Sequence, residues 1–200
     1  MKKLILLFGL ALYFNCSDGK KPIQGETGWQ QKMNADFKDA TKSPLTKKDR
    51  KSFEGLDFYT YNETFKVDAF LLRTPDSEYF KMKTNTDELR EERVYGILSF
   101  EINDELYKLN VYQGKESLET PGNEDYLFLP FLDNTNGEET YGGGRYIDLR
   151  IPEGDSIEID FNEAYNPYCV YNEKYSCPIV PRDNYLNLKI EAGVKAFKKE

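Results

Sequence analysis

Two polar segments in the second half of the chain hold the residue types best suited to chemistry. The first runs from Asp133 to Glu139 and is rich in Asp, Asn and Gly. Oxygen-rich loops of this kind bind calcium, but the glycine here is the fifth residue, whereas an EF-hand loop has it at the sixth. The same composition is typical of a surface turn. We therefore predict a turn without a bound metal.

The second segment, residues 141–146, reads Tyr-Gly-Gly-Gly-Arg-Tyr. Consecutive glycines expose backbone N–H groups, so Gly143 beside Arg145 is a candidate anion-binding nest. The segment is not a P-loop, because no Lys-Ser or Lys-Thr follows the glycines. Glycines are also needed where a neighbouring strand or a bulky tyrosine approaches the backbone closely, and we favour this structural interpretation.

Asp148 and Asp160 lie on expected strands and point away from the apolar face if the alternation holds. Such outward aspartates are usually only solvated, but a converging pair could act as the acid and base of a glycosidase. Convergence of the polar residues in one pocket would support a hydrolase-type enzyme with a bound divalent cation. The candidate polar pocket comprises Asp133, Glu139, Gly143, Arg145, Asp148, Asp160, Asn162 and Asn166.

The chain contains no histidine. This excludes Ser-His-Asp and Cys-His nucleophile activation as well as zinc sites with histidine ligands. We therefore favour a non-catalytic ligand-binding or structural module without a cofactor, and keep a carboxylate- and arginine-dependent hydrolase as the alternative.

The N-terminus has the layout of a bacterial export signal. Lys2 and Lys3 precede an apolar run over residues 4–14, which is too short to span a bilayer, and Cys16 follows. The arrangement resembles a lipobox, although residues 13–15 are not the usual small ones. We predict a signal peptide over residues 1–15, lipid on Cys16 and a flexible tether over residues 16–28. The chain would then be anchored in the bacterial cell envelope, on the periplasmic side or the cell surface. The alternative is an ordinary secretory signal with a chance cysteine.

Cys169 and Cys177 are separated by seven residues. In an exported protein two such cysteines favour a disulfide, which would stabilise the fold by roughly 2.5 kcal/mol in the chain-entropy model. A two-cysteine metal site is the weaker alternative, because it would need two carboxylates nearby.

Composition limits the partners. The net charge of −8 argues against nucleic-acid binding, so the expected contact with a membrane is through the lipid on Cys16. The 15 tyrosines and 13 phenylalanines suit a half-wet sheet, and they could also line a groove for a glycan, a peptide or another small molecule. We expect a monomer.

The hydrophobic pattern predicts one mainly β domain over residues 29–200. Trp29, Met33 and Phe37 recur at every fourth residue, which predicts a helix docked on the core, and Thr46 with Asp49 announces a second short helix. From Thr64 onward the period changes to two. We expect about eight short strands in an antiparallel sandwich or barrel behind a short N-terminal helical arm. Expected strand residues are Phe65–Leu71, Leu98–Ile102, Tyr107–Val111, Tyr126–Leu132, Ile147–Ile151, Ile157–Phe161 and Leu188–Ile190.

Several local strings stand out along the chain: Trp29, Ser43–Leu45, Phe53–Leu56, Phe131–Tyr146, Asp160–Cys169, Tyr175–Pro178 and Glu191–Gly193. Together they resemble the bacterial and archaeal family called domain of unknown function 1684. The resemblance extends from about Trp29 to Lys195, with one departure at Val194, where the family has an acidic residue. It implies that the glycine bend and the Asn-Pro/Cys segment belong to one signature, and it brings no activity or catalytic residue with it.

Overall fold

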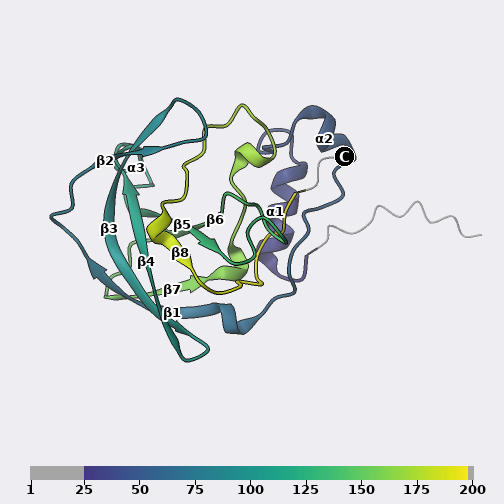
Figure 1. Ribbon diagram of the computed structural model, residues 1–200. Coiled ribbons are helices and arrows are strands. Elements are labelled where there is room, and N and C mark those ends of the chain that lie inside the picture. The colour runs from purple at the N-terminus through teal and green to yellow at the C-terminus, as the bar shows by residue number, and fades with distance from the viewer. Residues whose placement is uncertain (1–24, 198–200) are drawn as a thin grey trace, which may run out of the picture.

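The computed structural model describes residues 25–197 (Figure 1). The predicted signal peptide, Cys16 and most of the predicted tether lie outside the described residues. Within the described part, no helix is both long and apolar enough to cross a membrane. The helices are α1 (Gly28–Lys38), α2 (Lys47–Ser52) and α3 (Lys115–Glu119). The strands are β1 (Lys66–Arg73), β2 (Phe80–Lys83), β3 (Leu89–Ile102), β4 (Glu105–Gly114), β5 (Tyr126–Asp133), β6 (Arg145–Arg150), β7 (Ser156–Asp160) and β8 (Tyr185–Leu186).

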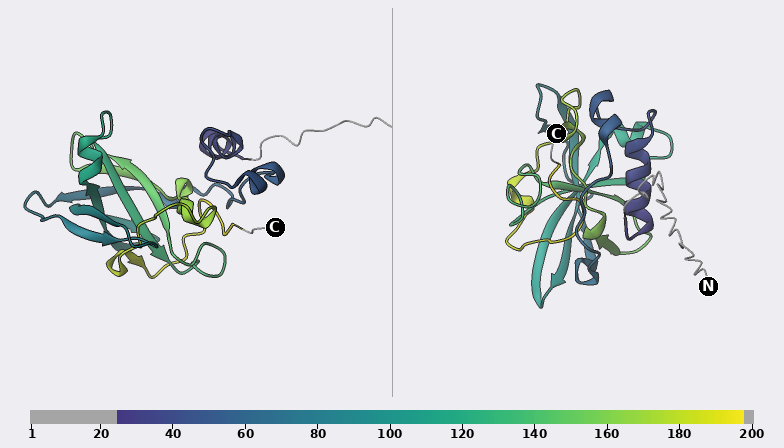
Figure 2. Two further views of the ribbon diagram at one scale, coloured as in Figure 1. Left: turned by 90° about the horizontal axis from the view of Figure 1, so that it is seen from above. Right: turned by 90° about the vertical axis from the view of Figure 1, so that its right-hand side faces the viewer.

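One eight-stranded sheet forms the body of the domain. Its strands follow the order β6-β5-β4-β3-β1-β7, all antiparallel, while β2 pairs with β3 and β8 pairs in parallel with β5. The edge strands β6 and β7 contact each other, so the sheet curls into a half-barrel (Figures 1 and 2). The prediction of a mainly β fold with a short N-terminal helical arm is therefore confirmed, in its barrel form.

The inner face of the half-barrel holds the main hydrophobic core. Strand alternation was the basis for predicting that face, and its residues are buried as expected. The β3–β4 hairpin also turns where predicted, because Asn103 and Asp104 adopt φ angles of 53° and 63°. The expected closing strand at Leu188–Ile190 is wrong: β8 lies earlier, although Ile190 is fully buried. Core members from six strands include Leu71, Leu98, Leu109, Leu129, Leu149 and Ile159.

The N-terminal arm packs through a second hydrophobic cluster, beyond one end of the half-barrel (Figure 2). Thr27 caps α1 by accepting a hydrogen bond from Gln30 N at 3.2 Å. Phe37 is buried in this cluster, whereas Trp29 and Met33 are only partly buried against it. Trp29, Met33 and Phe37 thus share one face of α1 as predicted. This face packs on the rest of the arm and on the C-terminal segment, and not on the barrel core. Thr46 caps α2 as predicted, accepting from Asp49 N at 3.2 Å.

A β-bulge in β3 reverses which side chains face outward. The β3–β4 pairing shifts between Val94 and Gly96, so that Tyr95 is the extra residue. Leu98 therefore faces the core, whereas Glu92 and Val94 lie on the outer face, where strict alternation would not have placed them.

Candidate functional site

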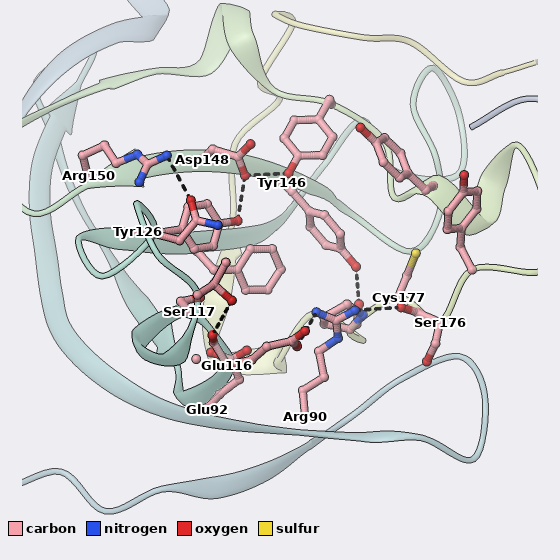
Figure 3. A pocket seen from close by; sticks show the side chains of 18 residues that line it. Arg90, Glu92, Glu116, Ser117, Tyr126, Tyr146, Asp148, Arg150, Ser176 and Cys177 are labelled. Carbon is pink, nitrogen blue, oxygen red and sulfur yellow. Dashed lines mark hydrogen bonds and ion pairs between the residues drawn. The ribbon is translucent and has the colours of Figure 1, made fainter. Parts of the chain in front are cut away.

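A pocket of about 600 Å³ lies on the outer face of strands β3–β6 (Figure 3). Pocket volumes of roughly 300–1,000 Å³ are typical of small-molecule sites. We call it the tyrosine pocket, because five tyrosines line it together with Phe128. Its remaining wall comes from α3 and from residues 165–178. The aromatic lining residues are Tyr126, Phe128, Tyr146, Tyr165, Tyr168 and Tyr175.

Strand register explains why β4, β5 and β6 supply the floor. Tyr112 lies opposite Phe128, and Phe128 lies opposite Asp148, so these three side chains share the outer face. Tyr126 lies opposite Arg150 on the same face. Their neighbours in sequence point to the core instead, which leaves the outer face free to carry polar groups.

Glu92 is the most unusual group in the tyrosine pocket. It is 7% exposed, and its Oε2 has no hydrogen-bond partner among the described residues. Burial, with little help from neighbouring charges, raises the pKa of Glu92 from 4.5 to about 7. Its carboxyl group is thus poised between the neutral and the charged form near neutral pH.

Gly114 makes the room that Glu92 occupies. The two residues are direct partners in the β3–β4 register, and a Cβ at position 114 would lie 2.9 Å from Glu92 Oε1. No side chain larger than hydrogen fits there without displacing the carboxyl group.

Asp148 is the second carboxylate of the tyrosine pocket. Its Oδ1 accepts hydrogen bonds from Tyr126 Oη at 2.8 Å and from Tyr165 Oη at 2.6 Å (Figure 3). Burial, reinforced by the Asp148 charge, raises the pKa of both tyrosines far above the ordinary value, so the hydroxyls stay protonated donors. Because both bonds use Oδ1, neither tyrosine occupies Oδ2.

The two arginines of the pocket already have carboxylate partners. Arg150 Nη1 lies 2.7 Å from Asp125 Oδ1, and Arg90 Nη1 lies 4.0 Å from Glu116 Oε2. Arg90 also donates to Ser176 O at 3.4 Å. The lining therefore offers no uncompensated positive charge, and it is poorly suited to a phosphate or another strongly anionic ligand.

Residues 175–178 form the rim beside Arg90 and are fastened to the end of β2. Cys177 N donates to Asn85 Oδ1 at 2.6 Å, and Asn85 N donates to Cys177 O at 3.0 Å. Tyr146 Oη donates to Pro178 O from the pocket floor. These bonds hold the rim in place over the sheet.

Cys169 and Cys177 are free thiols in this structure, so the predicted disulfide is not formed in it. The two residues are nevertheless neighbours, because Cys169 N donates to Cys177 Sγ at 3.2 Å. A hydrogen bond from the Cys169 thiol also lowers the pKa of Cys177. Among residues 25–197, no group of three or more acidic or thiol side chains is arranged to hold a metal ion.

The predicted polar residues do not converge. Only Asp148 lines the tyrosine pocket; Asp133 and Arg145 form a fully buried ion pair, with 2.8 Å between Oδ2 and Nη2. Asp133 also accepts from Thr135 N at 2.8 Å, while Arg145 donates to Ile190 O at 2.8 Å and to Ala192 O. Burial lowers the pKa of Arg145, and the Asp133 carboxylate opposes this shift. This pair fastens the C-terminal segment and is closed to solvent.

The other predicted residues also have structural partners. Asp160 Oδ1 accepts from Asn162 N at 2.9 Å, and Asn162 donates to Asn62 O at 3.0 Å. Asn166 is buried and donates to Lys195 O at 2.9 Å. Glu139 is exposed and accepts from Tyr59 Oη at 3.1 Å. The structure therefore does not bring the predicted set together in one pocket.

The glycine string is a close-approach bend, as favoured from the sequence. Gly144 has φ +88°, and a Cβ there would lie 2.5 Å from Phe131 O. At Gly143 a Cβ would lie 2.5 Å from the Tyr141 ring. The bend lets Arg145 turn directly into the core, and Gly143 does not line the tyrosine pocket.

These features define a mainly β half-barrel with a tyrosine-lined outer pocket. Residues 51–195 match the family described as "Protein of unknown function (DUF1684)", so the chain belongs to that family. A search of curated proteins gave no match. A solved relative is the solution NMR structure of an uncharacterized protein from gene locus rrnAC0354 of Haloarcula marismortui, with 29% sequence identity and a TM-score of 0.62. The similarity covers 84% of this chain and 94% of that one.

Proposed function

We propose that this domain is a binding module for a neutral, polyhydroxylated ligand, a glycan, which occupies the tyrosine pocket. The observation that carries the proposal is a ligand-sized pocket in which five tyrosines surround the Asp148 carboxylate, whose Oδ1 accepts hydrogen bonds from two of them. The Glu92 carboxyl group borders the same pocket, with its Oε2 buried and without a hydrogen-bond partner among the described residues.

The pocket lining supports a sugar over other small molecules. Sugar rings have apolar faces that pack on tyrosine rings and edges of hydroxyls that both donate and accept hydrogen bonds. Asp148 Oδ2 offers an acceptor that the tyrosines have already oriented through Oδ1. Glu92, with a pKa of about 7, is able to donate as well as accept. Arg90 and Arg150 already have carboxylate partners, so the pocket is poorly suited to an anionic ligand.

Isothermal titration of the purified protein with cello-, malto- and chito-oligosaccharides tests this proposal. We expect one series to bind, and Asp148→Asn to weaken its binding at least tenfold. Asp76→Asn, an exposed aspartate outside the pocket, is the matched control and leaves affinity unchanged. Equal affinity of the protein and the Asp148→Asn variant, or heat of binding to none of the three series, overturns the proposal.

We also propose that the site works outside the cytoplasm, on a chain anchored by lipid at Cys16. The basic and apolar order of residues 2–14 supports export. Labelling of cells with an alkyne fatty acid tests the anchor: label is expected on the protein and absent from the Cys16→Ala variant. Label retained by that variant, or found on neither protein, contradicts the anchor.

In that compartment we propose that Cys169 and Cys177 become a disulfide, since they are already neighbours. Mass spectrometry of protein from the native envelope, alkylated without reductant, would then show both cysteines unmodified. Alkylation of both would contradict the disulfide.

A further inference from the structure

A second hollow of about 100 Å³ lies beside the tyrosine pocket. The two share Asp148, Tyr165 and Tyr168 in their linings, so these three residues form a common wall. The far side of the hollow belongs to α1, which contributes Trp29 and Met33. The N-terminal helix thus borders a site that is otherwise built by the sheet.

Trp29 and Met33 are four residues apart and therefore lie on the same face of α1. The Trp29 ring packs edge-on against Phe58, with 6.1 Å between ring centroids and 73° between planes. Both side chains are only partly buried in the second hydrophobic cluster. The indole ring is therefore positioned by packing, while part of its surface remains available to the hollow.

We propose that this hollow is a second subsite, with Trp29 as its aromatic platform, and that the ligand is an oligosaccharide instead of a single sugar. This inference rests on the proposed function. A cavity of roughly 150 Å³ accommodates one six-membered ring, so the tyrosine pocket has room for more than one. The adjoining hollow, at about 100 Å³, is smaller than one ring, so a further sugar would stack on Trp29 and enter the hollow only in part.

The lining of the hollow restricts the sugar that enters it. Asp148 and Glu163 are its charged residues, and no lysine or arginine lines it. Burial raises the pKa of Glu163. Two carboxyl groups accept hydrogen bonds from neutral hydroxyls, but they repel a uronic acid or a sulfated ring. The second subsite therefore takes a neutral ring.

Trp29 is the sole tryptophan of the chain, so its fluorescence reports occupancy of this subsite directly. Each oligosaccharide series is titrated at one, two, three and four rings, with binding measured calorimetrically and tryptophan emission recorded in parallel. We expect tighter binding with length, and an emission change only for ligands longer than those that first give heat. Trp29→Ala should lower the affinity for the longest ligand about tenfold and leave the affinity for the shortest ligand unchanged.

Trp29→Phe keeps a ring against Phe58 and controls for loss of the arm's packing, which thermal unfolding of both variants measures. Partial recovery of long-ligand affinity in Trp29→Phe supports a platform. Glycan binding with the same affinity at all lengths, or without any emission change, overturns the second subsite while leaving the proposed function standing. If none of the three series binds, both the second subsite and the proposed function are overturned.

Discussion

Gly114 lies directly opposite Glu92 in the β3–β4 register, and the missing side chain at residue 114 is what admits the Glu92 carboxyl group to the pocket. The β-bulge at Tyr95 turns Glu92 outward, and Gly114 leaves it space. Together they bury a carboxyl group in the wall of the tyrosine pocket. That arrangement costs stability, which is expected of a functional site more than of a packing position.

Glu92→Gln should change how stability depends on pH. The folded-state pKa of Glu92 is raised to about 7 from 4.5, so the folded protein favours the neutral acid. This group's contribution is fully present below pH 4.5 and is lost as pH rises through about 7, by up to about 3 kcal/mol. We expect Glu92→Gln to be the more stable protein at pH 8 in urea unfolding, with little difference at pH 4.5.

Glu101→Gln is the matched control, because it is an exposed glutamate on the same strand. Its free energy of unfolding should equal that of the parent protein at both pH values. A Glu92→Gln variant that is no more stable than the parent at pH 8 would show that the carboxyl group is solvated in the native state.

Gly114→Ala should displace Glu92 and open the pocket floor. The Cβ would lie 2.9 Å from Oε1 and 3.2 Å from Oε2, so the carboxyl group must move. Because the atoms that the Cβ meets are the end of a flexible side chain, we expect a loss of less than about 1 kcal/mol in unfolding free energy at pH 5, together with a changed ligand affinity. Gly154→Ala, where a Cβ meets nothing within 4 Å, serves as control. Full stability of Gly114→Ala together with unchanged ligand affinity would remove the role assigned to this glycine.

Asp133→Asn should destabilise the fold strongly. It leaves Arg145 charged and fully buried without its carboxylate, for which a cost of about 3–5 kcal/mol is typical. Glu158→Gln breaks the exposed pair with Lys66, 3.1 Å apart, and should cost less than about 1 kcal/mol. Chemical unfolding of both variants makes the comparison. Equal effects would mean that the buried pair contributes no more than a surface one.

Gly144→Ala should be among the most damaging changes in the glycine string. The residue has φ +88°, and a Cβ would lie 2.5 Å from Phe131 O, so backbone strain and a backbone clash coincide. We expect more than about 2 kcal/mol of lost stability. At Gly142 the nearest atom to an added Cβ is 3.6 Å away, so Gly142→Ala should be nearly neutral. Similar melting temperatures for the two variants would contradict the close-approach explanation.

Local pattern predicted most of the fold and little of the site. Alternation placed Leu98, Leu109 and Ile159 in one core because a period of two is a local property of strands. Alternation did not predict the outward position of Glu92, because a single bulge reverses the faces of β3 and the sequence carries no clear mark of that bulge. Asp133 and Arg145 were expected in a polar pocket, yet carbonyl groups of the C-terminal segment surround the guanidinium and bury it.

Asp148 was the one member of the predicted polar pocket that lines the tyrosine pocket, since its outward position follows from strand alternation alone. Its partners Tyr126 and Tyr165 come from another strand and from a segment after β7. Their convergence depends on sheet order and curvature, which are tertiary properties. The outward-facing Tyr126, Asp148 and Arg150 on adjacent strands were the sequence signal closest to the site.

Chemical-shift mapping tests the central claim, that a glycan occupies the tyrosine pocket, most directly. The ¹⁵N-labelled protein is titrated with the tightest-binding oligosaccharide, and backbone amide shifts are followed residue by residue. We expect the largest changes at Gly114, Ser117, Asn123 and Ser176, which line the pocket on four separate segments. Shifts confined to the exposed apolar residues Phe70 and Leu72 of β1, or no shifts at a saturating concentration, would contradict it.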